Sequence, residues 1–214
     1  MGMEGINWDE VNSQAAKIRS CLQAFNENVA SKTQSFANDL SNYWASGNAV
    51  NFEKDLNSAI KDVALEITNG YDDLSNLIVH AAKIYSSVFN VPCNISVGDI
   101  IYSSLTSSID SVFKETNNGI TGMNKTSATN CVEKYKSDIN TMTDAVKSEL
   151  GNIHISILDA ASIQKEAFDQ KIQIMLDKIT NKIENTLATI EKSKNEEIDR
   201  MELAKNQTTN TFSA

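Results

Sequence analysis

The chain has 214 residues, enough to bury a substantial core as one domain or as two small ones. Its single proline and eight glycines leave few helix breakers, which favours long uninterrupted helices over a sheet protein with many turns. The net charge of −9 argues against a nucleic-acid partner, whose affinity comes mostly from clustered Lys and Arg, and disfavours binding to anionic membrane surfaces.

The N-terminal residues 1–5 have neither the basic stretch nor the apolar core of a secretory signal. No run of apolar residues approaches the eighteen or so that a membrane-spanning helix needs. We therefore expect any export to use another route.

Residues 8–42 and 48–90 are expected to form the two helices of a hairpin. Apolar side chains recur in both at every third or fourth position, which is the spacing of one helix face. Asn7 is placed to cap the first helix, which no proline or glycine interrupts. Gly70 lies inside the second helix, at a cost of about 1 kcal/mol relative to alanine.

The turn at residues 43–48 is the feature around which we expect the chain to be organised. Trp44 is placed to close the tip of the hairpin with its indole ring. Gly47 is expected to take a backbone conformation that other residues resist, and Asn48 to cap the second helix. A purely structural alternative is that Trp44 plugs the hairpin end without any partner being involved.

Pro92 ends the hairpin, because it disfavours a helical conformation at the residue before it. A loop is expected to follow, then a short helix over 96–113 that opens with the capping pattern of Ser96 and Asp99. Turn residues at 117–122 end this serine-rich region. The apolar face of the short helix would consist of Ile100, Ile101, Leu105, Ile109, Val112 and Phe113.

A new apolar stripe begins near Ser127 and continues to about residue 190, with spacings typical of a helix packed lengthwise on others. Gly151 and Asn152 either divide this region into two helices or lie within one, and the pattern leaves both open. Further on, Glu196 and Arg200 are spaced to support each other on one helix face, and residues 206–214 are expected to be a disordered tail.

The titratable residues indicate no catalytic or metal site. The three cysteines, Cys21, Cys93 and Cys131, form no Cys-x-x-Cys pair and are expected to be free thiols, with a Cys93–Cys131 bridge as the alternative. The two histidines, His80 and His154, lie far apart in the sequence and in no metal-ligand spacing.

Adjacent acidic residues also predict no catalysis. The pairs Asp72-Asp73 and Glu196-Glu197 point in diverging directions on a helix, so they indicate a solvated face rather than a general acid and base. The chain has no glycine-rich phosphate loop and no nucleophile elbow. We expect a protein that is not an enzyme and has no cofactor, metal or small-molecule substrate.

The sequence thus predicts an all-α fold, in which an elongated antiparallel hairpin extends into a four-helix-type bundle or coiled coil with a long C-terminal helix. Its parts are a hairpin at 1–91, a loop, short helix and turn at 92–126, a long helical region at 127–205 packing on the hairpin, and the tail. The candidate residues for helix-to-helix interfaces are Trp8, Phe25, Phe36, Phe52, Ile139, Phe168, Ile172 and Ile179.

The turn Trp44-Ala45-Ser46-Gly47, the apolar stripes around it and the missing signal peptide resemble the Trp-x-Gly family (early secreted antigen-like proteins) of bacterial type VII secretion, over about residues 6–91. The resemblance implies a helical hairpin that pairs into an antiparallel four-helix bundle. It also implies export without a cleavable signal, membrane contact only through a secretion apparatus, and a role as a secreted partner or targeting module for larger toxins.

The chain departs from the family pattern in two places. Two residues, Ala45 and Ser46, separate Trp44 from Gly47 where the family has one. The family's export signal is a Tyr followed four positions later by an acid, but here Tyr85 is followed by Phe89.

Because the chain is about two hairpins long, it could hold both halves of the family's bundle. Alternatively, the second half could pair with a separate helical protein or self-associate. An intracellular coiled-coil scaffold, and a helical membrane-active toxin, are the functions expected if the resemblance is misleading.

Overall fold

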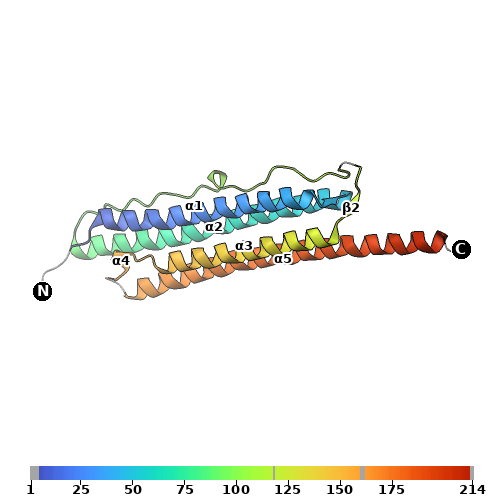
Figure 1. Ribbon diagram of the computed structural model, residues 1–214. Coiled ribbons are helices and arrows are strands. Elements are labelled where there is room, and N and C mark those ends of the chain that lie inside the picture. Colours follow the sequence, from blue (N-terminus) through green and yellow to red (C-terminus); the bar gives the residue numbers. More distant parts are fainter. Residues whose placement is uncertain (1–4, 118, 160–161, 213–214) are drawn as a thin grey trace. The chain divides into compact units, whose positions relative to one another are not determined.

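The computed structural model describes residues 5–117, 119–159 and 162–212 (Figure 1). These residues are predominantly helical, which confirms the all-α prediction, and they add one small antiparallel sheet. The elements in chain order are α1 (Trp8–Ser41), β1 (Trp44–Ala45), α2 (Gly47–Phe89), a 3-10 turn (Tyr102–Ser104), β2 (Gly122–Met123), α3 (Lys125–Gly151), α4 (Ser156–Asp159) and α5 (Ser162–Phe212).

The described residues pack into two units, and each of the four long helices contributes a segment to both. Unit 1 is built from residues 5–27, 63–106 and 142–180, and unit 2 from residues 28–62, 107–141 and 181–212. Each unit therefore contains a segment of the α1–α2 hairpin together with segments of α3 and α5.

In the core of unit 1, α2 and α5 approach each other closely at Gly70. A Cβ atom added at Gly70 would lie 2.2 Å from Met175 Cγ and 3.0 Å from Met175 Cβ, so α5 occupies the space that a side chain would need. From helix propensity alone Gly70 is only a cost, whereas the packing against Met175 favours it. Ile18, Leu22, Ile67, Leu74 and Leu150 are fully buried in the same core.

The core of unit 2 joins α1 to α2 and α3 through aromatic rings. Phe36 stacks on Tyr135 with ring centroids 4.3 Å apart, and it meets Phe52 edge-on at 6.5 Å. The Tyr135 hydroxyl shares a hydrogen bond of 2.8 Å with the Thr33 hydroxyl. Since both hydroxyls are buried, this bond satisfies the polar ends that the helix interface would otherwise leave unpaired.

Residues 90–117, which we call the strap, are mostly extended and return along the α1–α2 hairpin, as the trace in Figure 1 shows. The prediction of a helix over 96–113 is wrong. Within these residues only Tyr102–Ser104 are helical, as a single 3-10 turn. Ile101 is 62% exposed, whereas Leu105 and Ile109 are buried, so the apolar residues do not share one helix face. Contacts with the hairpin override the local helical pattern.

In unit 1, side chains of α1 hold the backbone of the strap. The Ser96 N–H donates to Asn12 Oδ1 over 2.8 Å, and the Thr106 N–H donates to Asn26 Oδ1 over 2.7 Å. The residue numbers of the partners increase together along α1 and along the strap, so the strap runs parallel to α1. The fully buried Asn26 amide is thereby used to receive a backbone donor of the strap.

In unit 2, side chains of α2 hold the strap in the same way. The Ile109 N–H donates to Asn57 Oδ1 over 2.7 Å. The Glu53 carboxylate accepts the N–H groups of Val112 and Phe113 over 2.8 and 3.0 Å. Burial raises the pKa of Glu53, but hydrogen bonds from the strap outweigh it, so the pKa lies below its usual value.

The second helical region is divided, and Gly151 is the last residue of α3. The segment that follows contains the single turn α4, whose Ile157 and Leu158 are buried. The helix α5 continues to Phe212 and so includes most of the residues expected to form a disordered tail. Residues 202–211 are all exposed, which agrees with their polar sequence.

Of the helices described, none is both long and apolar enough to cross a membrane.

Candidate functional site at the Trp44 turn

Trp44 is buried at the tip of the hairpin, 2% exposed, as the turn pattern predicts. It lies in β1, which pairs antiparallel with β2 so that Trp44 faces Met123 and Ala45 faces Gly122. Beyond the strands, the Asn124 N–H donates to the Tyr43 carbonyl oxygen over 2.8 Å. The residues that follow the strap are therefore fixed to the turn by backbone pairing.

The Ser46 hydroxyl is the hydrogen-bonding centre of the turn. Its oxygen accepts from Trp44 Nε1 over 2.9 Å and from the Ala49 N–H over 3.2 Å. Accepting from the N–H three residues ahead is the geometry of an N-cap, so Ser46 caps α2. The expectation that Asn48 is the cap is therefore wrong, because α2 begins at Gly47 and Asn48 lies inside its first turn.

Asn48 instead contacts α5. Its side-chain N–H donates to Glu197 Oε2 over 2.9 Å. Arg200 donates to both carboxylate oxygens of Glu197, over 3.0 and 2.7 Å, and the Ser46 hydroxyl also donates to this carboxylate. A carboxylate that is 1% exposed is thus satisfied by three residues, two of which belong to the turn.

The Glu197 carboxylate is held in its charged form. Burial alone raises its pKa, but the hydrogen bonds from Arg200, Asn48 and Ser46 and the charge of Arg200 outweigh burial, so the pKa lies below its usual value. Arg200 was expected to pair with Glu196. The structure pairs Arg200 with Glu197, and Glu196 with Lys192 at 3.7 Å.

Aromatic rings enclose the indole of Trp44. Its ring centroid lies 5.1 Å from that of Phe52 on α2 and 6.1 Å from that of Phe113 on the strap. Phe52 and Phe113 also meet edge-on at 5.7 Å. The strap therefore supplies one wall of the pocket that holds Trp44, which the sequence pattern of the hairpin alone does not reveal.

Gly47 does not have the role expected for it. It is the first residue of α2, and its φ is not positive, unlike that of Gly119 and Gly122. A Cβ atom added at Gly47 would meet nothing within 4 Å. The packing of the turn therefore does not require a glycine at this position.

The candidate interface residues lie mostly inside the chain's own cores. Trp8 is half-buried and meets Tyr85 edge-on, with ring centroids 6.2 Å apart. The buried members of the set are Phe25, Phe168, Ile172 and Ile179 in unit 1, and Phe36, Phe52 and Ile139 in unit 2.

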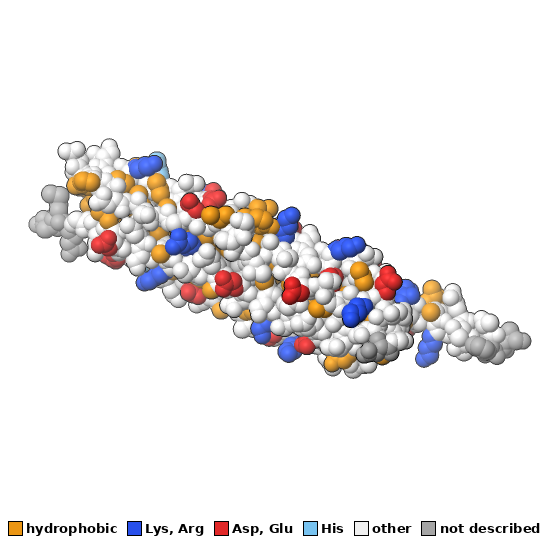
Figure 2. Space-filling view, turned by 90° about the horizontal axis from the view of Figure 1, so that it is seen from above, with side chains coloured by type: hydrophobic (Ala, Val, Ile, Leu, Met, Phe, Trp, Pro, Cys, Tyr) orange, Lys and Arg blue, Asp and Glu red, His pale blue; other side chains and the backbone are white. Residues whose placement is uncertain are grey.

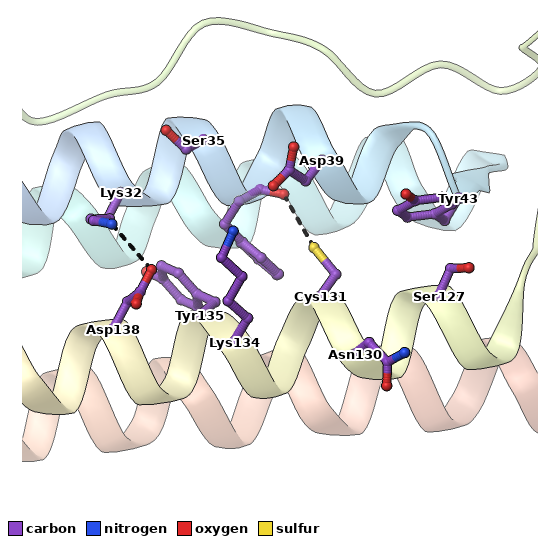
Figure 3. A pocket seen from close by; sticks show the side chains of 11 residues that line it. Lys32, Ser35, Asp39, Tyr43, Ser127, Asn130, Cys131, Lys134, Tyr135 and Asp138 are labelled. Carbon is purple, nitrogen blue, oxygen red and sulfur yellow. Dashed lines mark hydrogen bonds and ion pairs between the residues drawn. The ribbon is translucent and has the colours of Figure 1, made fainter.

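A groove of about 360 Å³ lies between α1 and α3 in unit 2 (Figure 3). Lys32 and Asp138 form an ion pair of 3.2 Å across one end, and Tyr43 lines the other end. The wall between them carries Asp39 and Lys134, so acids and bases are mixed. This lining provides no site of one charge sign for an ionic ligand.

The Cys131 thiol lies in this groove, where burial disfavours its reactive thiolate form. Burial, followed by the nearby Asp39 charge, raises its pKa to about 11. Its Sγ lies 3.9 Å from the Phe36 carbonyl oxygen, as a weak donor. At neutral pH the thiol is protonated, and the reactive form of a cysteine is the thiolate.

The remaining titratable residues form no metal site in the part of the chain that the structure describes. Those residues contain no group of three or more His, Cys, Asp or Glu side chains that could hold a metal ion. His154 pairs with Asp159 at 2.7 Å on the surface, and His80 is exposed. Cys93 and Cys131 are free, so the alternative of a bridge between them is wrong.

Comparison with protein-family models, curated proteins and solved structures gives no match.

Sequence reasoning missed Glu197 because it assigned the last part of α5 to a mixed-charge surface. A signal was nevertheless present. The stripe Leu187, Ile190 continues at the same spacing through Lys194 and Glu197, which are 4% and 1% exposed. Charged residues at core positions of an amphipathic helix indicate a buried polar contact, since such residues are rarely buried unpaired.

Proposed function

We propose that this chain is a non-enzymatic, secreted or targeting module of a bacterial type VII secretion system, which acts by helix-bundle pairing. The observation that carries the proposal is the buried Trp44 turn between two long antiparallel helices. This is the feature on which the resemblance to the Trp-x-Gly proteins rests. The face seen in Figure 2 is consistent with a protein partner, because acidic and basic side chains are interspersed and form no basic patch for nucleic acid.

The chain supplies its own second hairpin. Residues of α3 and α5 cover the hairpin face that carries Phe36 and Phe52, and Glu197 reaches from α5 to the turn. This arrangement favours the alternative in which one chain holds both halves of the family's bundle. A separate partner would then bind the outer surface and would not replace α3 or α5.

The experiment is to express the chain in a bacterium with a type VII system, with its ATPase intact or deleted. We expect the protein in the culture supernatant only when the ATPase is intact, with a cytoplasmic marker protein reporting lysis. Equal amounts in both supernatants, or none in either, would contradict the proposal and favour an intracellular scaffold.

Gly47→Ala distinguishes recognition of the turn from its folding. The added methyl group meets no atom within 4 Å, so thermal unfolding should be unchanged. If the secretion machinery reads the glycine, secretion should fall while stability stays constant. Gly119→Ala is the comparison for an effect on folding alone. Gly119 lies outside the motif and has a positive φ of 77°, which alanine disfavours.

A further inference from the structure

Exposed apolar side chains gather in unit 1 where α2 meets the strap. Val88 is 70% exposed, Phe89 49%, and Ile84 and Val91 are each 40% exposed. Ile84 and Val88 are neighbours on one helix face, four residues apart. We call these four residues the hinge cluster. A group of exposed apolar side chains of this kind marks a contact surface, whereas isolated ones do not.

The connection beside this cluster has the properties of a hinge. Asn90 has a φ of 53°, in the left-handed region, and lets the chain reverse direction after α2. Pro92 follows and favours an extended conformation at Val91, which would equally suit a chain that continues without reversing. Residues 90–93 are all exposed, so a change of conformation there breaks no core.

Residues 90–93 connect two parts of the chain, and each part contributes segments to both units. The first part contains α1 and α2, and the second contains the strap, α3 and α5. In each unit, contacts between the two parts join a residue that precedes the hinge in the sequence to a residue that follows it. The pair Asn26 and Thr106 is an example in unit 1, and Asn48 and Glu197 in unit 2.

We propose that two copies of this chain exchange the part that follows Asn90 and form a domain-swapped dimer through the hinge cluster. In such a dimer α1 and α2 of one copy pack against the strap, α3 and α5 of the other. Every contact between the first and the second part is remade by the same residues from the other chain. The free energy of exchange is then set by the hinge and by the new contact beside it, and not by the cores.

The charge distribution favours a second copy as the occupant of the hinge cluster. A two-fold interface places a surface against itself, so any charge on it would meet its own like charge. Residues 84–98 contain no acidic or basic side chain. The chain as a whole carries a net charge of −9, which repels a second copy elsewhere. The hinge cluster is thus a place where two copies can meet without this repulsion.

The first test is refolding of the purified full chain from denaturant at low and at high protein concentration. We expect monomer at low concentration and a dimer at high concentration, measured by size-exclusion chromatography with light scattering. The dimer should persist after dilution, because its release requires the cores to open. Monomer at every concentration, or a dimer that dissociates at once on dilution, would overturn the proposal.

The second test asks which chain supplies the second part. Lys32 on α1 and Asp138 on α3 lie 3.2 Å apart, on opposite sides of the hinge in sequence. One copy carries Lys32→Cys and the other Asp138→Cys, both with Cys93→Ser and Cys131→Ser, and the two are refolded together. We expect a short bismaleimide to link the two chains in the dimer fraction. A dimer without this link would overturn the exchange, since side-by-side copies keep the pair within one chain.

The third test concerns the hinge cluster itself. Val88→Asp places two like charges together across the two-fold axis, and we expect the dimer association constant to fall by about tenfold or more. Ile174→Asp is the matched control, because Ile174 is 54% exposed on α5 and lies outside the cluster. Equal association constants for the two variants would overturn the role of the cluster. The three tests use purified protein and do not depend on the proposed secretion role.

Discussion

Replacing Trp44 by alanine should strongly destabilise the chain. The indole is 2% exposed, and its ring lies against Phe52 and Phe113. Truncating a buried Trp to Ala costs about 3–5 kcal/mol, and the lost hydrogen bond to Ser46 accounts for roughly 1 kcal/mol of this. We therefore expect a loss of about 3–5 kcal/mol, which lowers Tm by roughly 6–20 °C in a chain of this size.

The assay is urea and thermal unfolding followed by far-UV circular dichroism. Trp44→Phe keeps an aromatic ring and removes the N–H donor, so it should cost only about 1–2 kcal/mol. Trp8→Ala is a control for tryptophan loss, and should cost less than Trp44→Ala because Trp8 is half-buried. A loss below about 1 kcal/mol for Trp44→Ala would refute the reasoning, since the turn would then be only a connector.

Gly70→Ala should destabilise by about 1–3 kcal/mol in chemical unfolding, because the new Cβ overlaps Met175. Combined with Met175→Ala it should cost less than the sum of the single changes, and strict additivity would contradict the tight approach. Glu197 has a lowered pKa, so its stabilisation is present above its unfolded value near 4.5 and is lost as pH falls through the folded value. In the Glu197→Gln variant, the thermal unfolding midpoint should therefore fall less steeply than in the unchanged protein as pH is lowered from about 4.5. Iodoacetamide at mildly alkaline pH should alkylate exposed Cys93 and leave Cys131 largely unmodified, as mass spectrometry of the native protein would report.

The long helices could be predicted because their evidence is local. Apolar residues at helical spacing, the Asn7 cap and the scarcity of breakers place α1 and α2 within a residue or two of their observed bounds. Asn7 Oδ1 accepts from the N–H groups of Asp9 and Glu10, as a cap should. The break that Gly151 suggested is present as well.

The strap could not be predicted because its conformation depends on distant residues. Its apolar residues have the spacing of a helix. Nothing in the local sequence shows that Asn26 and Asn57 accept hydrogen bonds from the backbone N–H groups of the strap. The stripe of α5 could have indicated that Glu197 is buried, but not that its partner is Asn48, which is 149 residues away. Contacts over such separations depend on the tertiary fold, which sequence periodicity does not encode.

The way the strap is held has a consequence for how this chain can vary in evolution. Asn12, Asn26, Asn57 and Glu53 recognise the backbone of the strap, and every residue type except proline offers the same N–H. The exposed strap positions can therefore diverge freely, whereas the helix polar residues that face them cannot. In an alignment of homologues, we expect the conserved positions to include Asn and Glu residues that a hydrophobicity profile would assign to the surface.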